Sequence, residues 1–188
     1  MREFRLFDTE RLELRATAAS DAEDLFAMFT DQNGWWYAPE SRHLTLSTTR
    51  GFLERSAARW PTDGLSYWTV RRLCDNVAIG VGGIQRHRTG SWNLSYRLDT
   101  AVQGNGYAQE LSRAAIDAAN RVDAAVPVIA WVAEINGPSR RVAERIGLVN
   151  YGVHLDLNDG ERRLAYADRE PDARFISLNQ DQPHPFSP

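Results

Sequence analysis

Two glycines separated by one residue stand directly before a predicted helix, in the segment QGNGYAQE at positions 103–110. Because glycine has no Cβ atom, such a backbone can turn several N–H groups toward one side. A helix that begins at about Tyr107 would add its free N–H groups and the positive end of its dipole. This combination favours a phosphate-binding loop without a lysine, whereas the glycine pair taken alone also fits an ordinary turn between a strand and a helix.

Two common nucleotide-binding motifs do not fit this segment. A Rossmann fingerprint requires a third glycine, where this chain has Gln109, and it requires a βαβ unit. The strand before Gly104 belongs instead to a series of predicted antiparallel strands. A Walker A loop requires a lysine and a hydroxyl residue after its glycines, and neither follows here. If this loop binds a phosphate group, it does so as a different kind of phosphate-binding motif.

The elements that must position the loop follow from the spacing of apolar residues. Alternating apolar and polar residues predict strands over 10–16, 65–73, 77–85 and 91–98, of which the last three form an antiparallel meander. Apolar residues at helical spacing predict helices over 20–29, 47–60, 107–122 and 136–147. Ser20 is the expected N-cap of the first helix, and Glu23 completes a capping box.

The C-terminal third of the chain adds a central strand and a hairpin. Residues 126–134 are apolar on both faces, which is typical of a strand in the middle of a sheet. The turn signal NDG at 158–160 lies between two further strand patterns and predicts a hairpin. The expected fold class is therefore α+β, with a mixed, mostly antiparallel sheet of about seven strands and four flanking helices. We expect one domain over residues 1–168 and a mobile or peripheral tail over residues 169–188.

The composition excludes several classes of protein. The formal net charge of the 188 residues is −3, which argues against a nucleic-acid-binding surface and fits a cationic substrate. Cys74 is the only cysteine, so the chain contains no disulfide framework. The charged N-terminal segment is not typical of a signal peptide, and no run of about 18 apolar residues exists to span a membrane. We expect a cytoplasmic protein that binds neither nucleic acid nor membranes, as a monomer or a homodimer.

Three segments, in order along the chain, resemble the GNAT superfamily of N-acetyltransferases. The family's pyrophosphate loop has Gln or Arg, two variable residues, Gly, one variable residue, and Gly or Ala, which is matched by Gln103, Gly104, Asn105, Gly106, Tyr107 and Ala108. The segment NGPSRRVAERIGL at 136–148 resembles the family's Asn-x-x-Ser helix, with Leu148 in place of a phenylalanine. The segment at 9–29 resembles the opening of the RimJ/RimL-type branch of ribosomal-protein N-acetyltransferases. The resemblance covers roughly residues 8–168.

This resemblance implies an enzyme that transfers an acetyl group from acetyl-CoA directly to a primary amine, with no covalent enzyme intermediate. The strands over 91–98 and 126–134 are expected to splay apart at their C-terminal ends, so that the pantetheine arm pairs with backbone groups near Leu98. The loop from Gln103 to Ala108 would hold the pyrophosphate, and Asn136 would bind the pantetheine arm. A longer donor, such as succinyl-CoA, is an open alternative.

The resemblance also implies candidates for protonating the CoA thiolate as it leaves. Many family members use a tyrosine for this task, at the position that is Ala143 in this chain. In the RimJ/RimL-type branch the serine at the start of the same helix is placed to serve instead, and here it is Ser139, which would also contact the cofactor. The alternative is that Ser139 is a solvent-facing residue of the first helical turn.

The general base is less closely specified. The branch often carries a glutamate on the strand before the loop, where this sequence has Asn93. Glu134 is the first candidate, because a carboxylate at the end of a buried strand is expected to have a raised pKa. Its alternative role is that of a surface charge where the strand ends. His154, Asp156 and bridging waters are further candidates.

The acceptor amine is expected to bind at the loop between the first two helices. The segment GWWYAPE at 34–40 offers Trp35, Trp36, Tyr37 and Glu40, which can hold a cationic amine by cation–π contact and charge pairing. At least one tryptophan is expected to fill the core instead. The acceptor is either a protein N-terminus or a small amine, such as an antibiotic, a polyamine or an amino acid derivative.

Two alternatives to an enzyme remain open in the sequence. A non-catalytic acyl-CoA-binding module is favoured by the missing tyrosine and by Asn93, and an unrelated α+β binding domain would explain the glycines as a turn. No metal site is expected, because His43, His87 and His184 show no ligand spacing with one another or with Cys74.

Overall fold

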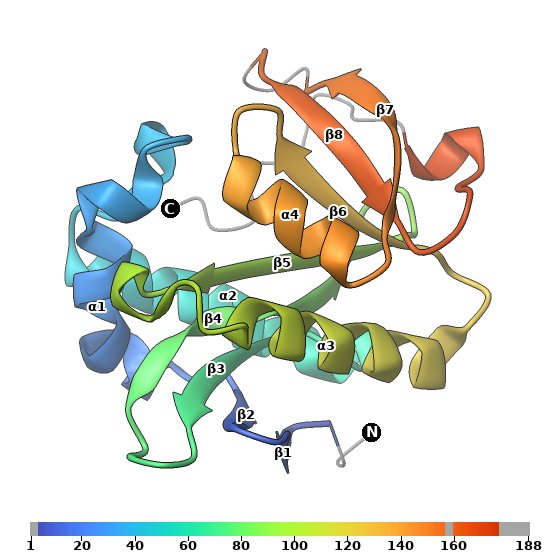
Figure 1. Ribbon diagram of the computed structural model, residues 1–188. Coiled ribbons are helices and arrows are strands. Elements are labelled where there is room, and N and C mark those ends of the chain that lie inside the picture. Colours follow the sequence, from blue (N-terminus) through green and yellow to red (C-terminus); the bar gives the residue numbers. More distant parts are fainter. Residues whose placement is uncertain (1–3, 157–159, 177–188) are drawn as a thin grey trace.

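Eight strands form one sheet in the computed structural model, which describes residues 4–156 and 160–176 (Figure 1). The strand order along the sheet is β1-β2-β3-β4-β5-β6-β8-β7. The strands are β1 (Leu6–Asp8), β2 (Leu12–Ala16), β3 (Tyr67–Arg72), β4 (Ala78–Arg86), β5 (Trp92–Leu98), β6 (Val128–Ala133), β7 (Val149–Leu155) and β8 (Arg162–Ala167). All neighbouring strands are antiparallel except β5 and β6, which are parallel. The predicted mixed sheet is confirmed, with β1 as a strand too short to give an alternating pattern.

Four α-helices pack on the two faces of the sheet, as predicted: α1 (Ala22–Thr30), α2 (Leu46–Asp63), α3 (Tyr107–Asp123) and α4 (Gly137–Arg145). Figure 1 shows α3 and α4 in front of the sheet and α2 behind it. In front, Leu111 of α3 is buried with Trp92 and Leu94 of β5. Behind, Phe29 of α1 packs against Phe52 of α2. None of the helices in the described ranges is long and apolar enough to cross a membrane.

The start of α1 differs from the predicted capping box. Ser20 lies within a 3₁₀ turn (Ala19–Asp21), and the helix begins after Asp21. The buried carboxylate of Asp21 accepts hydrogen bonds from the Ala18 N–H at 3.0 Å, from the Thr69 hydroxyl at 2.6 Å and from the Arg15 guanidinium at 2.5 Å. The prediction of Ser20 as the N-cap is wrong, because the partners of Asp21 on β2 and β3 were not visible in the local sequence.

The C-terminal part of the fold is the predicted hairpin with additional packing beyond it. Strands β7 and β8 pair antiparallel, while residues 158 and 159 of the predicted turn at 158–160 lie outside the described residues. Phe175, in a 3₁₀ turn after β8, is buried with Ile129 and Ala165 on the face of the sheet opposite α4. Phe175 and Ile176 therefore pack onto the domain, whereas Ala173 and Arg174 are exposed. Residues 177–188 of the predicted tail lie outside the described part of the chain.

Candidate active site

The two parallel strands at the centre of the sheet pair only at their N-terminal ends. The register joins Trp92 to Val128 and Asn93 to Ile129, and it ends there. Beyond these pairs β5 continues to Leu98 and β6 to Ala133, and Figure 1 shows the two strands diverging. The predicted splay is therefore confirmed, and it opens a gap in an otherwise continuous sheet.

Backbone groups of β5 face this gap. The N–H of Trp92 donates across to the carbonyl oxygen of Pro127, which precedes β6, whereas the N–H of Asp99 donates to the carbonyl oxygen of Ile79 in β4, each at 2.9 Å. Because backbone groups alternate between the two sides of a strand, those of residues 94, 96 and 98 point into the gap. An extended amide-containing chain can therefore pair with them as an additional strand. Leu98 lies at the open end of the gap, where the sequence placed it.

The glycine segment forms the bend between β5 and α3, and α3 begins at Tyr107 as predicted. Gly104 and Gly106 have φ angles of 82° and 81°, a left-handed backbone that glycine adopts without strain. The side-chain amide of Asn105 donates to the carbonyl oxygens of Val102 at 3.0 Å and Gln103 at 3.3 Å. The Asn105 side chain therefore stabilises the conformation of the loop.

Within the described residues, no backbone hydrogen bond engages the N–H groups of residues 104–108. These N–H groups lie at the positive end of a 17-residue helix. Successive free N–H groups at a helix start are suited to bind phosphate oxygens. The predicted roles of Gln103 to Ala108 toward a pyrophosphate are compatible with this geometry and stay predictions.

Helix α4 follows directly after β6 on the other side of the gap. The side-chain oxygen of Asn136 caps this helix by accepting a hydrogen bond from the Ser139 N–H at 3.2 Å. Asn136 is buried, and this oxygen is used within the protein. Its predicted bond to the pantetheine arm can use its amide N–H groups or the second lone pair of this oxygen. Ala143 faces the core of the domain, so no acid occupies that position.

Tyr96 is a candidate that the sequence analysis did not single out. It lies on β5 beside the gap, and its hydroxyl is close enough to Ser139 for that side chain to influence its ionisation. Burial raises the pKa of Tyr96 to about 12, and the neighbouring Ser139 hydroxyl acts in the opposite direction. Two hydroxyl groups, one from each side of the gap, therefore lie together. The pairing of Tyr96 with Ser139 joins residues 43 positions apart, so local sequence patterns could not reveal it.

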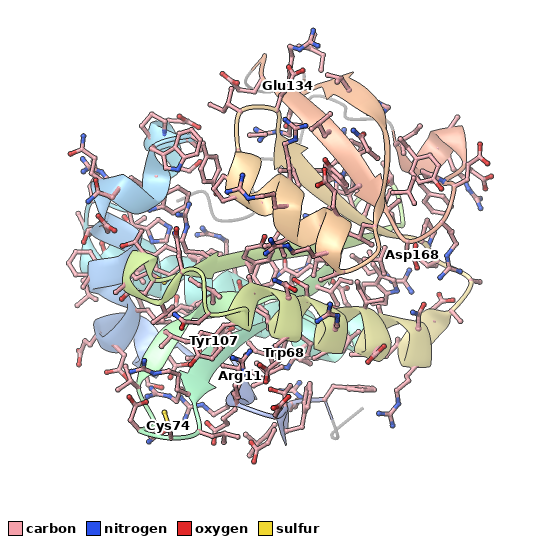
Figure 2. All side chains as sticks on the ribbon, viewed as in Figure 1. Arg11, Trp68, Cys74, Tyr107, Glu134 and Asp168 are labelled. Atoms are coloured by element: carbon pink, nitrogen blue, oxygen red, sulfur yellow. The ribbon has the colours of Figure 1, made fainter. Side chains whose placement is uncertain are left out.

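The expected raised pKa of Glu134 is wrong. Its carboxylate accepts a hydrogen bond from the Arg162 guanidinium of β8 at 2.6 Å, and 40% of its side-chain surface is exposed. The ion pair with Arg162 lowers the pKa of Glu134. Figure 2 shows Glu134 at the top of the view and Tyr107, the first residue of α3, in its lower half. A role for Glu134 as general base stays a prediction, but the reason given for it does not hold.

We expect Glu134→Gln to change kcat/KM by less than about threefold. A general base contributes about a hundredfold or more, but a carboxylate with a lowered pKa that is paired with Arg162 accepts protons poorly. Steady-state kinetics with acetyl-CoA and an amine would measure the effect, with Arg162→Gln as the matched control that breaks the same ion pair. A hundredfold loss confined to Glu134→Gln would establish Glu134 as the base.

The two other candidates for the general base, His154 and Asp156, lie on the face of the sheet opposite α4. His154 packs edge-on against Trp131 at 5.5 Å between ring centroids, and its buried Nε2 has no partner among the residues that the structure describes. Asp156 accepts a hydrogen bond from Arg163 at 2.9 Å, and both side chains are buried. The Asp156 carboxylate is therefore held by a cation, whereas one nitrogen of the His154 ring has no such partner in the described part of the chain.

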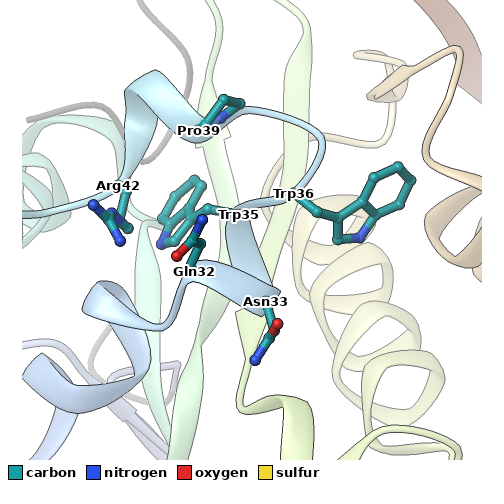
Figure 3. Close-up of a pocket in the computed structure, with 6 residues that line it drawn as sticks. All are labelled: Gln32, Asn33, Trp35, Trp36, Pro39 and Arg42. Carbon is teal, nitrogen blue, oxygen red and sulfur yellow. The ribbon is translucent and has the colours of Figure 1, made fainter.

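The predicted acceptor loop contains one core tryptophan and one exposed tryptophan. Trp35 is buried, and its indole N–H donates to the carbonyl oxygen of Phe29 at 2.7 Å. Trp36 is 53% exposed and points away from Trp35 in Figure 3. The expectation that one tryptophan fills the core is confirmed, and Trp36 remains the aromatic face that a ligand can reach.

A buried arginine, Arg97 of β5, fixes this loop and was missed by the sequence analysis. Its guanidinium donates to the carbonyl oxygen of Gly34 and, at 3.0 Å, to the hydroxyl of Tyr37. It also lies 3.5 Å from the ring centroid of Trp35. Burial lowers the pKa of Arg97, although the group remains a cation at neutral pH. The loop that is expected to bind the acceptor is thus held against the strand that borders the gap.

A second contact ties the acceptor loop to the turn before the glycine segment. The Thr100 hydroxyl donates to the Asp31 carboxylate at 2.8 Å, and the Asn33 N–H donates to the same side chain at 2.9 Å. These hydrogen bonds lower the pKa of Asp31, and the bond from Thr100 has the largest effect. The predicted acceptor loop and the predicted cofactor loop are therefore mechanically connected.

A hollow of about 540 Å³ lies on the acceptor loop, lined by Gln32, Asn33, Trp35, Trp36, Pro39 and Arg42 (Figure 3). Arg42 supplies the charge in this lining, while Glu40 is exposed outside it. The predicted use of Glu40 to pair with a cationic amine therefore stays a prediction without support from the lining. The hollow suits groups that accept hydrogen bonds more than it suits a cation.

The histidines do not form a metal site among residues 4–156 and 160–176, where no group of three metal-ligating side chains occurs. His43 is buried, stacks on Phe29 at 4.3 Å and pairs with the Thr49 hydroxyl at 2.9 Å. His87 pairs with the Thr89 hydroxyl at 2.7 Å. His184 lies outside the described residues.

Comparison with known families identifies the class of protein in which a splayed pair of parallel strands leads to this glycine-rich helix start. The sequence profile of the acetyltransferase (GNAT) domain matches residues 11–149. The chain therefore belongs to the GNAT acetyltransferase family. A comparison with curated protein sequences found no match.

Solved structures share this fold at low sequence identity. An acetyltransferase of the GNAT family from Bacillus anthracis has a TM-score of 0.74 and 22% identity, over 86% of this chain and 96% of that one. The ribosomal-protein-S5-alanine acetyltransferase from Vibrio fischeri has a TM-score of 0.70 and 19% identity, over 86% and 94%. RimL, a ribosomal L7/L12 α-N-protein acetyltransferase solved with coenzyme A, has a TM-score of 0.69 and 20% identity, over 86% and 96%. The structural likeness therefore includes members of the RimJ/RimL type.

Proposed function

We propose that this chain is an N-acetyltransferase that moves an acetyl group from acetyl-CoA to a primary amine within a ternary complex. The observation that carries the proposal is the gap between β5 and β6, which opens beside a glycine loop with free N–H groups. A pantetheine arm in the gap would pair with β5, and the loop would bind the pyrophosphate. The coenzyme A bound to the structurally similar RimL supports this choice of donor.

The proposed reaction needs no covalent intermediate on the protein. The amine nitrogen attacks the thioester carbon, the C–S bond breaks, and the acetyl group ends on nitrogen. The nitrogen loses one proton, and the departing thiolate gains one. Ser139, with Tyr96 beside it, is the proposed donor to the thiolate.

We propose that the acceptor is an N-terminal α-amine. At pH 7 about one in seven α-amines of pKa near 7.8 is neutral, compared with about four in ten thousand lysine amines. A site whose Glu134 is held by Arg162 favours the amine that needs less help to lose its proton. Arg42 with Gln32 and Asn33 in the hollow would bind the backbone carbonyl groups that follow a peptide N-terminus.

A pair of peptides tests the acceptor. One peptide has a free N-terminus and no lysine, and the other has a blocked N-terminus and one lysine. We expect kcat/KM for the first to exceed that for the second by about 100-fold or more, since the neutral fractions differ by roughly 300-fold. The measurement is thiol release from acetyl-CoA. A clear preference for the lysine peptide would overturn the proposed acceptor.

The same assay separates the enzyme from a non-catalytic acyl-CoA-binding module, an alternative favoured by Ala143 and by Asn93. Titration calorimetry with CoA and thiol release over a panel of amines are measured together. Binding with turnover supports the transferase, and binding without turnover of any amine supports the module. Repeating the assay with succinyl-CoA distinguishes an acetyl donor from a longer one.

A further inference from the structure

Arg11, the residue before β2, contacts the glycine loop and the first turn of α3. Its guanidinium donates to the carbonyl oxygen of Asn105 at 2.9 Å and forms an ion pair with Glu110 at 2.7 Å. It also lies over the ring of Tyr107, 4.7 Å from the ring centroid. Figure 2 shows Arg11 next to Tyr107. One side chain from the N-terminal part of the fold therefore supports the glycine loop.

The bond to Asn105 has a consequence for the direction of the loop's donors. The Asn105 carbonyl and the Gly106 N–H belong to one planar trans peptide unit, so they point in opposite directions. Because Arg11 holds the carbonyl on the protein side, the Gly106 N–H is turned away from Arg11 and no backbone acceptor among the described residues binds it. The side chain of Asn105 holds the Gln103 carbonyl in the same way.

The ion pair has a second consequence, for charge. Glu110 lies in the first turn of α3, next to the free N–H groups, and it accepts further hydrogen bonds from the Thr9 hydroxyl at 2.6 Å and the Arg11 N–H at 2.8 Å. Burial alone would raise the pKa of Glu110, but the hydrogen bonds from Thr9 and Arg11 outweigh it and lower that pKa. Glu110 is therefore ionised, and without a cation beside it the carboxylate would repel a bound phosphate.

We propose that Arg11 is a positioning residue for the pyrophosphate of CoA. It acts through two groups that it contacts, the Asn105 carbonyl and the Glu110 carboxylate. It orients the loop's N–H groups by holding the Asn105 carbonyl, and it neutralises the Glu110 carboxylate next to the anion. This inference rests on the proposed function, since it presupposes that the loop binds CoA.

Four variants test the assignment by calorimetric titration with CoA. We expect Arg11→Gln to raise the dissociation constant about tenfold or more, the effect of losing one hydrogen bond of a charged group. Glu110→Gln is expected to change it by less than about threefold. The double variant is expected to bind CoA more tightly than Arg11→Gln alone, because it lacks the Glu110 carboxylate that Arg11→Gln leaves without a neutralising cation. The control is Arg71→Gln, since Arg71 makes the same kinds of bond, to the Asn76 carbonyl and the Asp24 carboxylate, away from the loop.

A second measurement separates positioning from a general loss of structure. Acetyl-pantetheine has the thioester without the pyrophosphate, so its turnover by Arg11→Gln should stay within about twofold of the wild type while KM for acetyl-CoA rises. Equal losses with both donors would mean that Arg11 is merely structural and would overturn the inference. So would a wild-type affinity for CoA in Arg11→Gln. If the wild-type chain itself bound no CoA, the proposed function would fail first.

Discussion

Gly106→Val is expected to raise the dissociation constant for CoA by about 100-fold or more, the largest effect on binding anticipated for this fold. Position 106 has a φ angle of 81°, which a β-branched residue adopts only with strain. The valine would shift the backbone N–H groups of the loop away from the positions in which they can bind phosphate oxygens. Losing two hydrogen bonds to phosphate, each about 1.5–3 kcal/mol, gives at least this loss of affinity.

A matched glycine separates the loss of binding from the loss of fold. Gly152 of β7 has a φ of 100°, and a Cβ there would meet no atom within 4 Å, as is also true of Gly104. Gly152→Val should therefore carry similar backbone strain and bind CoA like the wild type, while Gly104→Val should bind it weakly. Calorimetric titration and thermal unfolding measure the two effects. Unimpaired CoA binding by Gly106→Val would remove the loop from the proposed site.

The features predictable from sequence are those set by local spacing. The start of α3 at Tyr107 follows from the glycines before it, and α4 follows from the helical spacing over 136–147, although its cap by Asn136 was not predicted. The splay of β5 from β6 was available through the family resemblance and is confirmed by the short register between them. The two helices depend on residues close together in the chain, whereas the splay involves two strands far apart in the sequence and was expected only from the resemblance.

The features that the sequence did not reveal depend on contacts between distant segments. Arg11 meets Glu110 across 99 positions, and Arg97 meets Gly34 across 63. Glu134 shows the consequence for chemistry. Its place after a buried strand predicted a raised pKa, but an arginine 28 positions later, on the adjacent strand, reverses the direction. The pKa of a group is thus set by partners that only the strand order brings together.

The hydroxyl pair beside the gap gives the largest expected effect on the chemical step. We expect Ser139→Ala and Tyr96→Phe each to lower kcat by about 100-fold, the lower end of what a positioned proton donor contributes. Because a donor to the thiolate acts after CoA is bound, the dissociation constant for CoA should change by less than about threefold. The matched comparison is Ser112→Ala, a serine of α3 whose buried hydroxyl has no hydrogen-bond partner among residues 4–156 and 160–176.

Two observations would distinguish a shared role from two separate ones. If the hydroxyl groups act as one unit, the double variant should lose no more than the worse single variant, because groups that act together are strongly non-additive. The raised pKa of Tyr96, about 12, keeps its phenol protonated across neutral pH, so kcat should show no decline from Tyr96 ionisation below about pH 11. Wild-type kcat in Ser139→Ala would show that the serine only faces solvent, whereas a loss confined to Tyr96→Phe would transfer the role of acid to the tyrosine.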